Sequence, residues 1–227
     1  MPAVDLAEIS VRELNQRLHD LAPGANESEW TISNPRGRHA IAVGLDAPAN
    51  LHIDGHVGYY CGGMNKQASI QIDGNAGQGL AENIMSGTVH CTGNASQSAG
   101  ASGHGGLVVV EGDASSRCGI SMKGVDIVVG GSIGHFSAFM AQAGHLVVCG
   151  DAGDGLGDSI YEAFIYVGGN VGSLGADCIE KEMTDAHRQT LAELLAKAGI
   201  DDDITRFRRF GSARELYNFN IDNAGNY

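Results

Sequence analysis

The sequence is short of basic residues, proline and aromatic residues, and it lacks a long apolar run. Its 227 residues include 14 Lys and Arg against 27 Asp and Glu, four prolines and 6% aromatic residues. The net charge of −13 disfavours anionic partners such as nucleic acids or anionic lipids. No apolar run approaches the roughly 18 residues of a membrane span, and Asp5 and Glu8 stand where a signal peptide would be basic and then apolar. We therefore expect a cytoplasmic protein without nucleic-acid or membrane partners.

The chain lacks paired cysteines, and the spacing of its five cysteines argues against the common metal sites. The five cysteines contain no C-x-x-C pair and stand 30, 27, 31 and 29 residues apart, unlike those of zinc ribbons or ferredoxin clusters. We expect them to be reduced, apolar packing residues. They are Cys61, Cys91, Cys118, Cys149 and Cys178.

Glycine, by contrast, is abundant, at 34 residues, and seven glycines recur at a strict interval of 19. The residues four before, two before and two after each of these glycines are apolar, and the residue seven after it is always Gly or Ala. Apolar residues at alternate positions are typical of a strand. The structural repeat is marked by Gly55, Gly74, Gly93, Gly112, Gly131, Gly150 and Gly169.

A 19-residue unit of this kind cannot bury its apolar face alone, but seven stacked units form a continuous core. The repeat therefore predicts an all-β core, a parallel β-helix of seven 19-residue rungs over residues 49–178. The residue after each glycine is mostly Asn, Asp or Ser, which we expect to hydrogen-bond its own backbone at a corner.

The flanking segments, residues 1–48 and 179–227, are expected to cap the two ends of the β-helix. Ser10 and Glu13 form a capping box at the start of an amphipathic helix, and the alternating apolar residues at 41, 43 and 45 predict a capping strand. In the C-terminal segment, Thr184 is expected to begin a second helix that ends at Gly199.

The last 27 residues carry four of the 14 basic residues together with aromatic residues. Such a tail, on an acidic protein, either folds back on the solenoid or docks on a partner. The candidate docking residues are Arg206, Phe207, Arg208, Arg209, Phe210, Tyr217 and Phe219.

Histidine offers a further metal hypothesis, which the repeat argues against. His52 and His90 occupy the same position in two rungs that are two steps apart. Strand spacing separates them by about 10 Å, too far for a shared zinc ion. We expect outward-facing structural histidines, and a solvated corner rather than a calcium site in the Gly- and Asp-rich segment 151–158. We assign no catalytic, cofactor-binding or metal-binding residue to the chain.

The pattern Gly55-x-x-Gly58-x-x-x-Gly62, which recurs from Gly150, resembles the G-x-x-G-x-x-x-G repeat of the C-terminal domain of the glutamate synthase large subunit. The resemblance covers residues 49–178 and implies that the β-helix is right-handed. With its flanks, the whole chain is similar to the free-standing β-helix subunit of N-methylglutamate synthase.

This resemblance implies a non-catalytic scaffold subunit. The expected partners are an amidotransferase-like subunit and a glutamate-synthase-like subunit that binds FMN and an iron–sulfur cluster, in a hetero-oligomer that makes N-methylglutamate from methylamine and glutamate. The chain begins Met1-Pro2, without the adjacent Cys that such an amidotransferase needs, and it is too short to add a flavin barrel. We therefore expect no cofactor in this chain.

Two alternatives stay open. A similar β-helix is a subunit of formylmethanofuran dehydrogenase and of the related formyltransferase/hydrolase complex, which would mean one-carbon transfer and other partners. The chain could also be a stand-alone structural or binding β-solenoid. We expect the tail to discriminate, since a tail folded onto its own solenoid favours the stand-alone interpretation.

Overall fold

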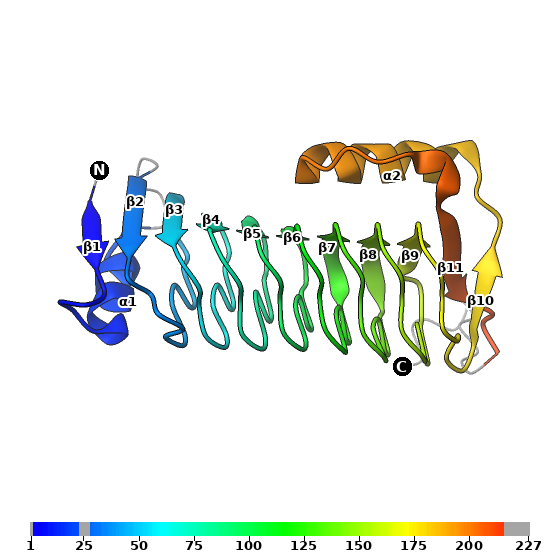
Figure 1. Cartoon of the computed structure of the whole chain (residues 1–227), viewed down its shortest axis with the longest axis horizontal. Helices are drawn as coiled ribbons and strands as arrows, with labels where there is room; N and C mark the ends of the chain where they lie inside the picture. Colours follow the sequence, from blue (N-terminus) through cyan, green and yellow to red (C-terminus); the bar gives the residue numbers. More distant parts are fainter. Residues whose placement is uncertain (1, 23–27, 216–227) are drawn as a thin grey trace, which may run out of the picture.

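The computed structural model describes residues 2–22 and 28–215. It shows a column of stacked β-rungs with one helix across its N-terminal end and another along the side of its C-terminal half (Figure 1). The helices are α1 (Val11–His19) and α2 (Asp185–Ala198), with a short 3-10 turn η1 (Ile204–Arg206). The strands are β1 (Ala3–Asp5), β2 (Ser28–Ser33), β3 (Ala49–Asp54), β4 (Ser69–Ile72), β5 (Thr88–Cys91), β6 (Leu107–Val110), β7 (Lys123–Val129), β8 (Ala143–Val148), β9 (Phe164–Val167), β10 (Cys178–Lys181) and β11 (Arg208–Ser212).

All eleven strands belong to one sheet, in the order β1-β2-β3-β4-β5-β6-β7-β8-β9-β11-β10. Strands β1 to β9 are parallel. From β3 to β9 the paired residues are 19 positions apart, as Leu51 and Ile70 are, except at a register shift in β7 where Lys123 pairs with Ala143. A second parallel column runs through single bridges from Val57 to Val171. The predicted all-β parallel β-helix with helical caps is confirmed.

The interior is built from the predicted apolar columns. The residues four and two positions before the repeat glycines are all buried, and none exposes more than 2% of its surface. Burial of each such aliphatic side chain contributes about 1.5–3 kcal/mol. Every rung repeats the same contacts, so each rung is stabilised by packing against the rungs directly before and after it.

The repeat glycines are required by the closeness of neighbouring rungs. A Cβ atom on Gly112 would lie 2.2 Å from Asn94 Oδ1 and 2.9 Å from Gly93 O, both in the preceding rung. The small residues seven positions later have a different role, since all of them except Ala176 adopt left-handed backbone angles, with φ of 66° at Gly100. Small residues therefore permit both the close stacking and the tight turn.

The polar residues after the repeat glycines do not hydrogen-bond their own backbone as expected. Each side chain instead accepts a hydrogen bond from the backbone N–H of its equivalent in the next rung. Asn94 Oδ1, for example, accepts from Asp113 N at 2.8 Å, and Asp113 Oδ1 accepts from Ser132 N at 2.7 Å. This corner ladder, from His56 to Asn170, links seven rungs in addition to the sheet.

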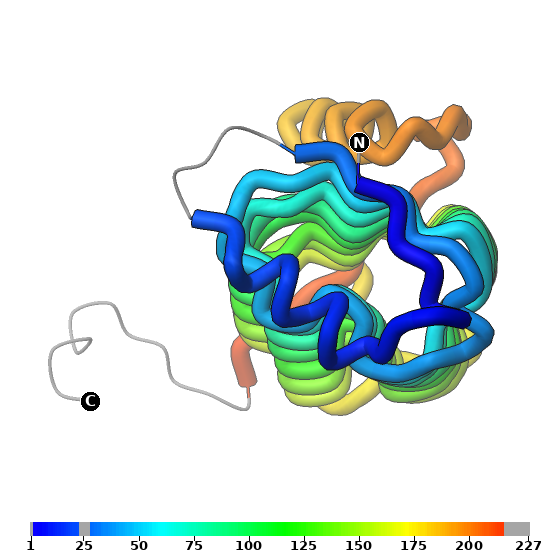
Figure 2. The backbone as a smooth tube through the Cα atoms, turned by 90° about the vertical axis from the view of Figure 1, so that its left-hand side faces the viewer, coloured from blue at the N-terminus to red at the C-terminus, as the bar shows by residue number. Residues whose placement is uncertain are grey.

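At the N-terminal end, α1 crosses the open end of the column, with Leu14 and Leu18 buried against it (Figure 2). The predicted capping box is present in part, since Ser10 Oγ accepts from Glu13 N at 3.1 Å. The strand expected over residues 41–45 does not form, because positive φ angles at Ala40 and Ala42 turn the chain. Instead β2 pairs with β3, so the parallel sheet extends beyond the expected boundary at residue 49.

At the C-terminal end, the chain folds back onto the column. After β10, α2 follows with Thr184 as its N-cap and Gly199 as its C-cap, as predicted, and it lies across β6 to β9 (Figure 1). The chain then returns as β11, which inserts between β9 and β10 and is antiparallel to both. Phe210 of β11 is buried in the main core. Within the described ranges, no helix has the length and apolar character needed to cross a bilayer.

Candidate functional site

The outer face of the main sheet is divided into a covered half and an open half. The residues that stand three positions before the repeat glycines point outward from the sheet. In β3 to β5 they are polar, and in β6 to β9 they are Val109, Val128, Val147 and Tyr166, all buried beneath α2. At this repeat position the residues change from polar in β3 to β5 to apolar in β6 to β9, which is where α2 covers the sheet. This change is visible in the sequence, but our sequence analysis did not draw on it.

The open half carries two histidine–carboxylate pairs. His52 Nε2 lies 3.1 Å from Asp73 Oδ2, and His90 Nε2 lies 2.8 Å from Glu111 Oε1. Each histidine therefore contacts a carboxylate of the next rung, and the two do not share a site. Both histidines lie on the outer face, as expected. Among the described residues, no three or more His, Cys, Asp or Glu side chains are grouped so that they could hold a metal ion.

The five cysteines are buried and free, as expected for packing residues. Burial raises the pKa of the Cys118 thiol to about 12. Cys149 lies on the covered outer face, and burial together with Asp202 raises its pKa to about 12. Because the thiolate is the reactive form, these cysteines are poor nucleophiles at neutral pH.

Five of the seven candidate docking residues are used inside the molecule. Arg206 forms an ion pair with Asp202 and donates from Nη2 to Cys149 O at 2.8 Å. Phe207 is buried beneath α2 and Phe210 is buried in the main core. The aromatic rings are therefore not available to a partner, because the insertion of β11 requires them for packing.

The other two arginines also fasten the C-terminal cap. Arg208 Nη2 donates to Gly169 O at 3.1 Å, and Arg209 Nε donates to Glu182 O at 2.8 Å. The remaining candidates, Tyr217 and Phe219, lie outside the described residues. Residues 206–210 thus form part of the C-terminal cap. Their two aromatic rings are buried, so they are not exposed for contact with a partner.

Exposed apolar side chains gather instead at a corner of the fifth rung. Phe136 exposes 46% of its surface and Met140 exposes 38%. The Phe136 ring meets the Phe139 ring edge-on, with centroids 6.3 Å apart. The equivalents of Phe136 in the two adjacent rungs are Arg117 and Gly155. A large apolar residue between an arginine and a glycine at the same repeat position was the sequence signal for this corner. Exposed clusters of this kind are typical of protein contacts.

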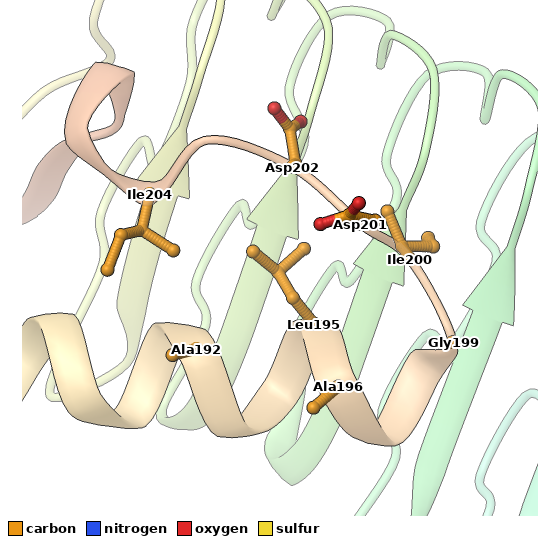
Figure 3. A pocket seen from close by; sticks show the side chains of 8 residues that line it. All are labelled: Ala192, Leu195, Ala196, Gly199, Ile200, Asp201, Asp202 and Ile204. Atoms are coloured by element: carbon orange, nitrogen blue, oxygen red, sulfur yellow. The ribbon is translucent and has the colours of Figure 1, made fainter.

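A hollow of about 390 Å³ lies between α2 and the segment that returns from it (Figure 3). Ala192 and Leu195 lie on the helix side, and Asp201, Asp202 and Ile204 lie on the returning segment. The carboxylate of Asp202 pairs with Arg206, which lowers the pKa of Asp202. The hollow therefore presents polar and apolar surface in similar measure, and the Asp202 carboxylate in its wall is already paired with Arg206.

Comparison with known proteins gives one full-length relative. No family model matches the sequence. The chain is 60% identical over 228 residues to "Protein GlxC" of Rhizobium meliloti (strain 1021), and the alignment covers 100% of both chains.

Proposed function

The chain belongs to the family of protein GlxC, and from this premise we propose that it is a non-catalytic scaffold subunit of a heteromeric glutamate-synthase-like enzyme. The specific enzyme we propose is N-methylglutamate synthase, which converts methylamine and L-glutamate to N-methyl-L-glutamate and ammonia. The partners would be an amidotransferase-like subunit and a subunit that binds FMN and an iron–sulfur cluster.

The observation that carries this proposal is the structural use of the G-x-x-G-x-x-x-G residues. A Cβ atom on Gly74 would lie 2.9 Å from Gly55 C, and one on Gly77 would lie 2.5 Å from Gly58 C. The third small residue turns the chain with a left-handed backbone in six of the seven repeats, as at Gly100. The residues that resemble the glutamate synthase repeat are thus the ones that set the distance between rungs, which supports the same architecture.

The interior of the column supports a scaffold rather than a conduit. It is filled along its length by buried aliphatic side chains. A small amine could not follow the axis without displacing this close-packed core. Any passage between the active sites of partner subunits would therefore lie along the outer surface.

The apolar corner at Phe136 is the partner contact that we propose. Large aromatic side chains dominate the binding energy of many interfaces. Phe136→Ser should therefore weaken assembly while leaving the fold intact, since the ring is half exposed. Met85→Ser is the matched control, because Met85 is an exposed apolar residue, at 42%, in another rung.

The test is co-purification of the tagged chain from its native cells, followed by mass spectrometry and an absorption spectrum. We expect an amidotransferase-like chain and a yellow-brown subunit to accompany the wild-type and Met85→Ser chains, and less of both with Phe136→Ser. If the components of a formyltransferase/hydrolase complex are recovered instead, the proposed function is wrong and the chain is a subunit of a one-carbon-transfer enzyme.

A stand-alone solenoid is the second candidate function, and one observation favours it. Residues 206–212 fold back onto their own column, through β11. The mass of the purified chain in solution, with and without extract from its native cells, distinguishes the two candidates. A colourless particle that contains this chain alone under both conditions would support the stand-alone function.

A further inference from the structure

A small basic hollow lies on the outer face of the sheet at its C-terminal end. Its volume is about 110 Å³, and β9, β10, β11 and the segment before β9 form its walls. The residues that line it include Tyr161, Glu162, Lys181, Arg209, Gly211 and Arg214. Three cationic side chains thus converge on one hollow of a protein whose net charge is −13.

The strand register brings two of these cations face to face. Lys181 of β10 is directly opposite Arg209 of β11 in an antiparallel pair. Side chains at opposite positions lie on the same face of a sheet, and like charges there are destabilising. An anion between Lys181 and Arg209 would convert this repulsion into two attractions.

The charges in the hollow are only partly balanced by the chain itself. Arg214 pairs with Glu162, with Nη2 and Oε2 2.7 Å apart. Arg209 donates its Nε to Glu182 O and lies over the Phe164 ring, 5.9 Å from its centroid. Among the residues described, the Lys181 ammonium has no hydrogen-bonding or ion-pairing partner. The hollow is therefore electropositive, and the N–H groups of the Lys181 ammonium are available to an anion.

Gly211 keeps the floor of the hollow open. A Cβ atom at this position would meet its nearest neighbours, Ala163 O and Lys181 Cγ, at 3.8 and 4.0 Å. Its φ angle is outside the left-handed region, so neither strain nor crowding requires glycine here. The missing side chain leaves space beside the Lys181 stem, where an anion can approach.

We propose that this hollow binds a carboxylate group, held by Lys181 and by the guanidinium of Arg209. Arginine and lysine donate charge-assisted hydrogen bonds to carboxylates, and arginine presents paired N–H groups to the two oxygens. The rim carboxylate of Glu162 disfavours phosphate, which concentrates up to two negative charges in one group, more than it disfavours a carboxylate group, which carries one. The carboxylate comes either from a free small acid or from an acidic side chain of a partner protein. The site does not rest on the enzyme proposed above.

Calorimetric titration of the full chain with acetate, succinate and inorganic phosphate, at constant ionic strength, tests the site. The variants are Lys181→Met, which removes one cation, and Gly211→Val, which fills the floor. The control is Lys197→Met, which removes an exposed lysine from α2. Thermal unfolding of each variant verifies that it folds.

We expect acetate or succinate to bind the wild-type chain and the control equally, and to bind Lys181→Met roughly tenfold more weakly, the effect of one charged hydrogen bond. If neither acid binds, but Lys181→Met loses a co-purifying protein that Lys197→Met retains, the carboxylate belongs to that partner. Equal binding by Lys181→Met and wild type, tighter binding of phosphate than of either acid, or no effect in either assay would overturn the proposal.

Discussion

Gly112→Ala tests whether rungs really stack as closely as the structure shows. The added Cβ would lie 2.2 Å from Asn94 Oδ1, and real Cβ atoms essentially never approach a heavy atom within 3.0 Å. Asn94 Oδ1 is also the acceptor for Asp113 N in the corner ladder. The substitution must therefore displace the Asn94 amide or separate two rungs.

The expected cost is about 2 kcal/mol of unfolding free energy. Overpacking costs about 1–3 kcal/mol, and a lost neutral hydrogen bond adds about 0.5–1.5 kcal/mol. The change from glycine to alanine also stabilises the folded state by about 0.4–1 kcal/mol, because alanine lowers the conformational entropy of the unfolded chain. For a chain of this size each kcal/mol lowers the thermal midpoint by about 2–4 °C, so the shift should be about 4–8 °C.

Urea and thermal unfolding, followed by circular dichroism, measure this effect against a matched control. Gly211→Ala makes the same chemical change where the nearest atom to the new Cβ is 3.8 Å away, so its stability should be unchanged or slightly raised. Adding Asn94→Ala to Gly112→Ala should recover part of the loss. Equal midpoints for Gly112→Ala and Gly211→Ala would refute the close stacking.

Three further predictions concern the cap, the pH dependence and the thiols. Leu191→Ala should cost about 2–5 kcal/mol locally, because Leu191 is fully buried on the face of α2 that covers β6 to β9. Amide hydrogen exchange should then accelerate in α2 but not in β3 to β5, and uniform acceleration would contradict this. Hydrogen bonds from Arg206 lower the pKa of Asp202 below 3.8, so its contribution to stability is present above pH 3.8 and is lost as the pH falls through the folded pKa. Asp202→Asn should therefore destabilise the protein at neutral pH but hardly at all well below pH 3.8, whereas an equal effect at both pH values would exclude this linkage. Ellman's reagent should label none of the five cysteines of the folded protein and all five in urea, and stoichiometric labelling of the folded protein would show that they are accessible.

The β-helix was predictable because its signal repeats. Leu51 pairs with Ile70 and Val89 with Val108, both at a separation of 19 residues, so the same side-chain requirements recur at the same positions. The first rung escaped detection, since Trp30 pairs with Leu51, which is 21 residues later. The alternating apolar residues at 41, 43 and 45 resembled a strand. The chain instead turns there, with left-handed backbone angles at Ala40 and Ala42.

The C-terminal cap was less predictable, because it depends on contacts between distant segments. The sequence indicated α2 through its caps, but nothing local specifies that β11 inserts between β9 and β10. That insertion buries Phe207 and Phe210, and it sets Lys181 opposite Arg209. The basic hollow is therefore a product of the fold, whereas the clustering of basic and aromatic residues alone suggested a free docking tail.

We propose that this chain is needed by an enzyme whose reaction centres lie in other subunits. The most direct test of this proposal is the formation of N-methylglutamate from methylamine and glutamate by the purified partner subunits, with and without this chain. We expect turnover to depend on the added chain and to saturate at a fixed ratio to the partners. Equal turnover in its absence, or no association with the partners, would contradict the scaffold function.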